Sequence, residues 1–319
     1  MKKPSIRLKR PSSNTAKQKF SFSFKQSAFL VVFASVLALG ATGYYYYQNV
    51  FTDPARILSD AVDKSLQTTS VTRTVTQTGT QNSVSQKLYV SYGPAVVSQS
   101  VTDLQESSSV GKTAVKTESI GTKDTDYVRY QDISVTGQDN VERKYNNVVG
   151  TWGKRQSDEQ TGQSVSFLDD ALFVIVPFGN LNPEQRAVMR AEINKSGVYD
   201  ITSTKQEFNN ARPVMTYRIS VNPQKLVQVL SKYVEVTGVG SNQQLDPRMY
   251  EGASDVQIDM EIDMLSKHIT KVNFADSGRV ETYTAYNAER SVPLPKDTVS
   301  IEELQNRLSE VEQQAQNKQ

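Results

Sequence analysis

Two segments of the chain alternate apolar and polar residues with a period of two. They cover residues 213–221 and residues 255–264 of the 319-residue sequence. Because successive side chains of a β-strand point to opposite faces, each segment needs one buried face and one solvated face. Antiparallel sheets commonly have this division, whereas strands of parallel sheets are apolar on both sides. The pattern therefore predicts an antiparallel sheet whose apolar face is covered by other parts of the chain.

Residues 70–145 extend this prediction, because they are rich in Ser, Thr, Val and Tyr, which favour strands over helices. Val71, Arg73 and Val75 are predicted to share one face of a strand. Further strands are predicted over residues 87–91, 127–130, 198–204, 271–275 and 280–287. Turn signals recur between the early strands, at Gly79, Gly93-Pro94, Gly111, Gly121 and Gly137. Strands separated by such signals are typical of an antiparallel meander.

Capping signals predict helices among these strands. Asp53, Asn182 and Asn222 each precede a proline, a combination typical of the start of a helix. Ser300 and Glu303 form a capping-box pattern ahead of a further apolar periodicity. The predicted helices cover residues 53–67 and 183–194, and two more begin after residues 222 and 300. Helices beside an antiparallel sheet define the α+β class. Only 37% of residues are hydrophobic, so the core is expected to be modest or hollow.

A different segment, residues 28–47, has the length and composition of a membrane helix. It contains no charged residue, and twenty helical residues reach about 30 Å, the thickness of the hydrocarbon core of a bilayer. Residues 1–27 carry eight basic side chains and no acidic one, and Tyr44–Tyr47 close the apolar run. Basic flanks stay in the cytoplasm and tyrosines gather at the lipid interface. A single-pass cell membrane protein with a cytoplasmic N-terminus is therefore predicted.

These segments set the predicted organisation of the chain. Residues 1–27 form a disordered basic tail that lies on anionic inner-leaflet lipid, and residues 48–52 are a short linker. An extracytoplasmic α+β domain follows over residues 53–312, with a loose tail over 313–319. The alternative is a cleaved signal peptide, with Ala38, Gly40 and Ala41 as the small residues of its cleavage site.

Composition argues against several kinds of site. The chain has no cysteine and one histidine, His268, which excludes disulfides, Cys-based zinc sites and two-histidine metal motifs. Outside the basic tail there are 28 basic and 34 acidic residues, so no nucleic-acid partner is predicted. Phosphate-binding glycine motifs and a nucleophile elbow are absent from the sequence. We therefore predict no enzyme and no cofactor. Four carboxylates on one strand face are read as a solvated surface: Asp255, Asp259, Glu261 and Asp263.

The order of elements resembles the LolA/LppX-like lipoprotein-carrier superfamily over residues 53–308. It runs from the first helix through strands, an apolar helical insert (167–176), the 183–194 helix and a strand-NPQKL-helix unit (215–233), and it ends after late strands at Val292-Pro293-Leu294-Pro295. The resemblance implies a curved antiparallel sheet, a half-open barrel, around an apolar cavity that accepts acyl chains or lipids. The implied cavity lining is Met215, Tyr217, Ile219, Val256, Ile258, Met260 and Ile262, with Leu172, Phe173 and Ile175 as a lid. The chain departs from the superfamily because it lacks a lipobox cysteine and keeps a predicted membrane helix.

These expectations lead to one main function and two alternatives. The main hypothesis is a membrane-anchored, non-catalytic protein that holds an acyl chain, lipid or lipoprotein in an apolar cavity. The first alternative is an anchored cell-envelope scaffold or adhesion module with a filled core. The second is a hydrolase that uses carboxylates such as Asp259 and Asp263. A cavity of roughly 300 Å³ or more separates the first two, because ligand pockets start near that size.

Overall fold

The chain is described here as a computed structural model over residues 53–316, except for residues 94, 109–110, 138–144, 158–165, 210–211 and 241–244. The chain divides into two units, Met1–Thr52 and Asp53–Gln319, and all the described residues belong to the second. The predicted basic tail, membrane helix and linker therefore lie outside the described residues. Within the described part, no helix has the length and apolar character needed to cross a membrane.

Among the described residues twelve strands form one sheet, in the order β12-β6-β5-β4-β3-β2-β1-β11-β10-β9-β8-β7. Neighbouring strands are antiparallel, apart from the parallel pair β12 and β6. The edge strands β12 and β7 do not pair with each other, so the sheet is open. The strands are β1 (Ser70–Thr78), β2 (Asn82–Ser91), β3 (Val97–Ser108), β4 (Gly111–Thr122), β5 (Thr125–Gly137), β6 (Trp152–Gln156), β7 (Tyr199–Asn209), β8 (Arg212–Val221), β9 (Val256–Asp263), β10 (Ile269–Phe274), β11 (Arg279–Thr284) and β12 (Val299–Ser300).

In the described part of the chain five α-helices accompany the sheet, and all except α3 start at the predicted capping signals. Asp53 and Asn222 accept hydrogen bonds from the first-turn amides of their helices, and Asn182 forms a full capping box with Gln185. Glu303 donates its amide to the hydroxyl of Ser300. The helices are α2 (Pro54–Ser65), α3 (Phe167–Leu172), α4 (Pro183–Ser196), α5 (Pro223–Thr237) and α6 (Ile301–Gln316), with a short 3₁₀ helix, η3 (Pro247–Tyr250). The predicted α+β class with an antiparallel sheet is confirmed.

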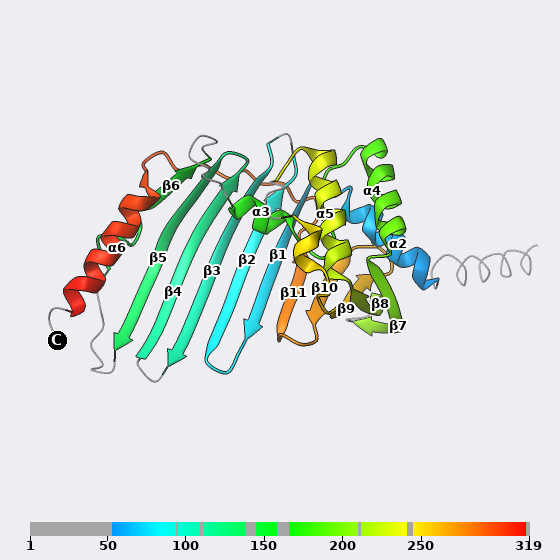
Figure 1. Ribbon diagram of the computed structural model, residues 1–319, viewed down its shortest axis with the longest axis horizontal. Coiled ribbons are helices and arrows are strands. Elements are labelled where there is room, and N and C mark those ends of the chain that lie inside the picture. Colours follow the sequence, from blue (N-terminus) through cyan, green and yellow to red (C-terminus); the bar gives the residue numbers. More distant parts are fainter. Residues whose placement is uncertain are drawn as a thin grey trace, which may run out of the picture. The chain divides into compact units, whose positions relative to one another are not determined.

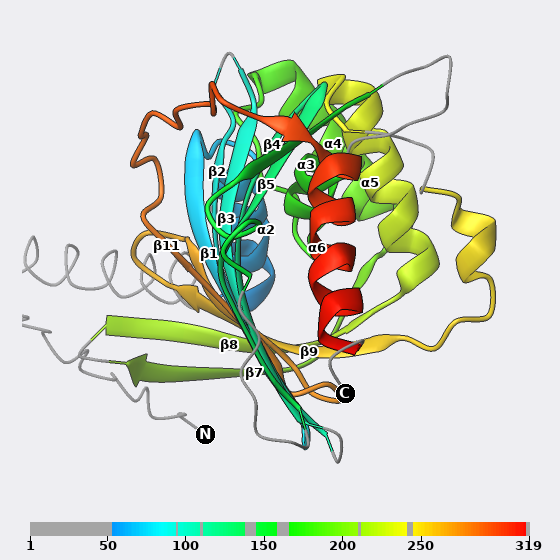
Figure 2. The same cartoon turned by 90° about the vertical axis from the view of Figure 1, so that its left-hand side faces the viewer.

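The helices gather on one face of the sheet. Figure 2 looks across the strands and shows α2–α6 on one side, with the chain that follows β11 on the other. Strands β8 and β9 run at a large angle to β1–β5 in this view, so the sheet twists strongly along its length. In Figure 1, α6 lies at one end of the covered face and α2, α4 and α5 lie at the other, with α3 between them.

Two separate apolar clusters lie under these helices. The larger cluster joins α2, α4 and α5 to strands β1, β2 and β8–β11. The smaller one joins α6 to β5 and to the turn that contains Tyr145 and Val148. Because the two clusters cover opposite ends of the same face, the strands between them carry fewer covering side chains.

Two glycines allow the helices to approach the strands closely. A Cβ atom at Gly121 would lie 2.6 Å from the amide nitrogen of Leu168, at the start of α3. A Cβ atom at Gly153 would lie 2.8 Å from a methyl carbon of Leu304 in α6. Gly121 was predicted as a turn signal, but it lies inside β4, because α3 packs against the strand at this position.

Several predicted bounds differ from the structure. The helical insert predicted over residues 167–176 ends at Leu172, since Phe173 has a non-helical backbone and Pro177 follows. The strand predicted over residues 280–287 ends at Thr284, because Ala285 and Asn287 have positive φ angles. Helix α6 continues to Gln316, into the predicted loose tail. Strand β6 and the two-residue strand β12 carried too little alternation to be predicted.

Candidate functional site

The seven predicted lining residues lie together on the covered face of β8 and β9. Met215, Tyr217 and Ile219 pair across the strands with Ile262, Met260 and Ile258. All six are at most 3% exposed, while Val256 at the start of β9 is half-buried. These side chains belong to or pack against the larger cluster, where they contact one another and the helices. The expectation that they line a ligand cavity stays a prediction.

The predicted lid residues lie in the same cluster. Leu172 is buried at the end of α3, and Phe173 and Ile175 pack against the cluster from the irregular segment that follows. The carbonyl oxygen of Ile175 accepts a hydrogen bond of 2.6 Å from the hydroxyl of Tyr199. This hydrogen bond joins the segment to β7. The segment packs against the same apolar cluster as β8 and β9.

An open pocket lies on the covered face of the sheet, next to α3. It has a volume of about 330 Å³, within the range of ligand-binding cavities. The cross-strand row Arg73, Leu88, Ser100, Ser119 and Val128 runs through its floor from β1 to β5. We call this the sheet-face pocket, and its lining is Arg73, Gln86, Leu88, Ser98, Ser100, Thr102, Leu104, Val115, Thr117, Ser119, Val128, Phe167, Asp170 and Ala171.

The lining combines small hydroxyl side chains with aliphatic ones. Ser98, Ser100 and Thr102 alternate along β3 on the pocket side, and Leu104 continues the row. Small side chains leave space on the sheet where larger apolar residues would fill it. The pocket can therefore accept a ligand that has both apolar and hydrogen-bonding parts.

Arg73 is one of two charged residues in the lining of this pocket, together with Asp170. It is 6% exposed, and its Nη1 lies 3.9 Å from Oε2 of Glu281, beyond hydrogen-bonding distance. Nη2 donates a long hydrogen bond of 3.4 Å to the carbonyl oxygen of Asp170. Within the described part of the chain, Nε has no hydrogen-bond partner. Glu281 instead accepts hydrogen bonds of 2.9 and 2.5 Å from Arg279.

A second open pocket lies between α2, α4 and β7. It has a volume of about 210 Å³ and is lined by residues such as Leu58, Val62 and Ile193. Because this volume is below that of ordinary ligand pockets, the second pocket is a weaker candidate for a ligand site. A third pocket, of about 540 Å³, lies where Val96, Val239 and Leu294 meet at the ends of the strands.

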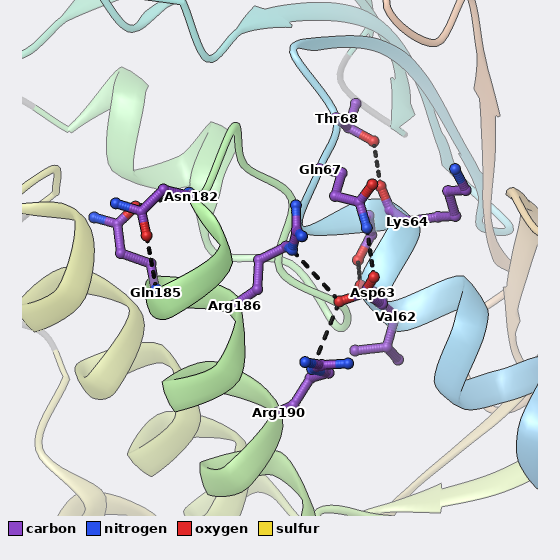
Figure 3. Close-up of polar contacts among 10 residues, drawn as sticks. Val62, Asp63, Lys64, Gln67, Thr68, Asn182, Gln185, Arg186 and Arg190 are labelled. Atoms are coloured by element: carbon purple, nitrogen blue, oxygen red, sulfur yellow. Dashed lines mark hydrogen bonds and ion pairs between the residues drawn. The ribbon is translucent and has the colours of Figure 1, made fainter.

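Figure 3 shows the ion pairs that join α2 to α4 beside the second pocket. Oδ1 of Asp63 lies 3.6 Å from Nε of Arg186 and 3.6 Å from Nε of Arg190. The side-chain amide of Gln67 donates a hydrogen bond to the other oxygen of Asp63. One carboxylate from α2 thus holds two successive turns of α4, an arrangement that fixes the helices together.

The four carboxylates on and just before β9 have separate partners. Asp259 pairs with Arg218 at 2.9 Å, Glu261 pairs with Lys271 at 3.3 Å, and Asp255 accepts a hydrogen bond from Ser220. Asp263 is buried, in contrast to the predicted solvated face, because it accepts hydrogen bonds from the turn amides of Leu265 and Ser266. No cluster of potential metal ligands occurs among the described residues.

His268 is half-buried and stacks on Tyr286, with ring centroids 4.0 Å apart. Burial lowers the pKa of His268, and the nearby Lys64 lowers it further. The sequence predicted an exposed turn histidine, and the stacking with Tyr286 explains the difference. Its place in the packing gives it a structural role.

The opposite face of the sheet carries a polar network. Glu118 accepts hydrogen bonds from Arg129, Gln99 and Gln131, and the guanidinium of Arg129 lies 4.7 Å above the ring of Trp152. Burial alone would raise the pKa of Glu118, but these hydrogen bonds outweigh it and lower the pKa. The single tryptophan is thus occupied by a cation–π contact within the protein.

Sequence reasoning missed the sheet-face pocket. It correctly placed Arg73 on the same face as the buried Val71 and Val75. A charged residue at an inward position was the available signal. The serines and threonines of β3 and β4 gave no such signal, because small polar residues are typical of a solvent-exposed strand face.

The fold is that of an α+β protein with an open, antiparallel sheet. Comparisons with known proteins do not assign the chain to a family. No family model matches the chain, and no curated protein matches it. A crystal structure of LprF from Mycobacterium bovis is similar at a TM-score of 0.40 and 14% identity, covering 75% of this chain and 95% of that chain. The predicted resemblance to the LolA/LppX-like superfamily therefore stays a prediction, and the function has to be argued from the pockets.

Proposed function

We propose that the domain is a non-catalytic binding module that holds the acyl chain of a lipid or lipoprotein in the sheet-face pocket. The observation that carries the proposal is the open pocket of about 330 Å³ between the two apolar clusters. Leu88, Leu104 and Val115 supply aliphatic contacts for a chain. Burying such a chain removes apolar surface from water, which is the main driving force for binding.

The predicted membrane anchor gives this activity its location. If residues 28–47 span the cell membrane with the N-terminus inside, the binding module lies outside the cytoplasm. The five residues of the linker reach about 17 Å when extended, so the module stays close to the headgroups. A binding module on so short a linker can exchange acyl chains with the membrane that anchors it.

Mass spectrometry of the purified full-length chain tests the proposal. Thr102→Trp places a large side chain in the pocket, whereas Gln105→Trp places it at an exposed position of the same strand. We expect a co-purifying lipid in the parent chain and in Gln105→Trp, and its loss in Thr102→Trp. The absence of lipid from every chain, or equal lipid in both variants, would contradict acyl binding in this pocket.

The burial of β9 supports a second candidate, an anchored cell-envelope scaffold or adhesion module whose core is filled by its own side chains. Met260 and Ile262 are fully buried, and if their neighbours fill the space around them, the apolar face of β9 needs no ligand. A scaffold of this kind needs no lipid. In the experiment above, it predicts that no chain carries lipid and that both tryptophan variants fold as the parent does.

A further inference from the structure

We propose that Arg73 binds an anionic headgroup in the sheet-face pocket, so that the ligand is an acyl chain that ends in a carboxylate or a phosphate. This inference rests on the proposed function and names the ligand class of the same pocket. It depends on the hydrogen-bonding capacity of one buried side chain and on the charges around it.

The guanidinium of Arg73 has more donors than the protein uses. Arginine carries five N–H donors, and the one hydrogen bond from Arg73 in the described structure is the 3.4 Å contact with the carbonyl oxygen of Asp170. Nε is buried without a partner among the described residues. Because unpaired buried donors are costly, an acceptor in the pocket that reaches the unused Nη donors is favourable. An oxyanion suits this position, since arginine binds carboxylate and phosphate with two parallel hydrogen bonds.

Glu281 is a weak counter-ion for Arg73, because its carboxylate is engaged by other groups. Glu281 is 2% exposed, and it is hydrogen-bonded to Arg279 at 2.5 Å and to the hydroxyl of Tyr283. Two guanidinium groups therefore face one carboxylate, and Arg279 has the shorter contact. The second nearby carboxylate belongs to Asp170, an exposed residue that also lines the pocket. Burial raises the pKa of Asp170, while Arg73 opposes this shift. A ligand oxyanion competes with Asp170 for Arg73.

The arrangement of the lining gives the ligand a direction. Arg73 is on β1 at one end of the floor, and the aliphatic residues Leu88, Leu104 and Val115 are on β2, β3 and β4. Neighbouring strands lie about 4.8 Å apart, so the floor extends roughly 14 Å from β1 to β4. A headgroup at Arg73 thus leaves the chain to lie across the next strands.

Binding of matched ligands to the unaltered protein tests whether Arg73 binds an anionic headgroup. A naturally fluorescent polyene fatty acid, its methyl ester and a lysophosphatidic acid are titrated into the full-length chain in nanodiscs of neutral phospholipid, with empty nanodiscs subtracted. We expect the fatty acid to bind about tenfold more tightly than its uncharged ester, the effect of one charge-assisted hydrogen-bonded pair. Tighter binding of the lysophosphatidic acid than of the fatty acid assigns phosphate as the preferred head, and the reverse order assigns carboxylate.

Two variants move the affinity in opposite directions. Arg73→Gln removes the charge and should reduce the preference for acid over ester to about twofold or less. Asp170→Asn removes the competing carboxylate at an exposed position, so the acid should bind more tightly and the ester should not change. If Arg73→Gln fails to fold, Asp170→Asn and the unaltered chain still decide the question.

The outcomes separate this inference from the proposed function. Equal affinities of the parent chain for acid and ester, or an Asp170→Asn variant with no gain for the acid, would overturn headgroup binding by Arg73. Acyl binding in the pocket would survive that result. Failure of both the acid and the ester to bind would instead overturn the proposed function, and headgroup recognition with it.

Discussion

The hydroxyl of Tyr217 donates a hydrogen bond of 2.6 Å to the carbonyl oxygen of Pro54, the first residue of α2. The ring of Tyr217 is fully buried on β8, so the bond joins the start of the domain to the middle of the sheet. Burial raises the pKa of Tyr217, and the charge of Asp53 raises it further, which keeps the hydroxyl protonated as a donor. A residue that was predicted to line a cavity thus also joins β8 to the start of α2.

Replacing this hydroxyl should therefore lower stability. Tyr217→Phe removes this hydrogen bond, at a cost of about 1 kcal/mol in the free energy of unfolding. Urea denaturation of the full-length chain measures the change, with the exposed Tyr250→Phe as the matched control. Equal unfolding midpoints for both variants would show that the hydrogen bond contributes nothing.

A substitution at Met260 tests whether side chains of the protein fill the core around β9. If its side chain is packed on all sides, Met260→Ala leaves a cavity and costs about 2–5 kcal/mol of unfolding free energy. Met249→Ala makes the same substitution at a residue that is 75% exposed and should have little effect. A loss below about 1 kcal/mol at Met260 would indicate that its side chain faces an open cavity, as the sequence predicted.

Gly121 tests the contact between β4 and α3. Gly121→Ala places a methyl group 2.6 Å from the amide nitrogen of Leu168, and a backbone atom cannot move aside without shifting the helix. We expect a loss of about 1–3 kcal/mol, as for other overpacked positions, measured by thermal unfolding. At Gly93, where the nearest atom to an added Cβ is 3.5 Å away, the same substitution should be tolerated. Equal stability of the two variants would contradict the close packing of α3.

The lowered pKa of Glu118 predicts that the stability of the domain depends on pH. Its pKa is lowered in the folded chain, so its contribution is fully present above the unfolded-state pKa of about 4.3 and is lost as the pH falls through the folded value. Glu118→Gln should therefore be less stable than the parent at neutral pH and should lose less stability on acidification below about pH 4.3. Urea midpoints from pH 7 to pH 3 measure this. Parallel pH profiles for the variant and the parent would contradict it, and the exposed Glu106→Gln controls for the loss of one charge.

Local signals made much of the fold predictable. The proline after each cap at Asp53, Asn182 and Asn222 marked three helix starts, because capping depends on neighbouring residues. Alternation marked β8 and β9, since one face of each strand is buried. Strand β6 was not predicted, because its position depends on pairing with β5 and on the contact of Gly153 with Leu304 in α6.

The site was harder to predict, because it depends on where the helices leave the sheet uncovered. Alternation showed that Ile258 and Met260 face inward, but it could not show whether their own chain or a ligand fills the space. Ser100 and Thr102 resembled ordinary surface residues, and only the pairing of β2 to β5 gathers them with Arg73. The inward position of Arg73 was visible in the sequence, and its poor pairing appears only in three dimensions.

Photocrosslinking tests the central claim most directly. A fatty acid with a photoreactive group near the end of its chain is irradiated with the full-length protein in nanodiscs, and the labelled peptides are identified by mass spectrometry. We predict that the label falls on residues 98–104 and 115–119 of β3 and β4, and that an excess of unlabelled fatty acid removes it. Label on β8 and β9, or label that excess fatty acid does not remove, would contradict a ligand site in the sheet-face pocket between the two clusters.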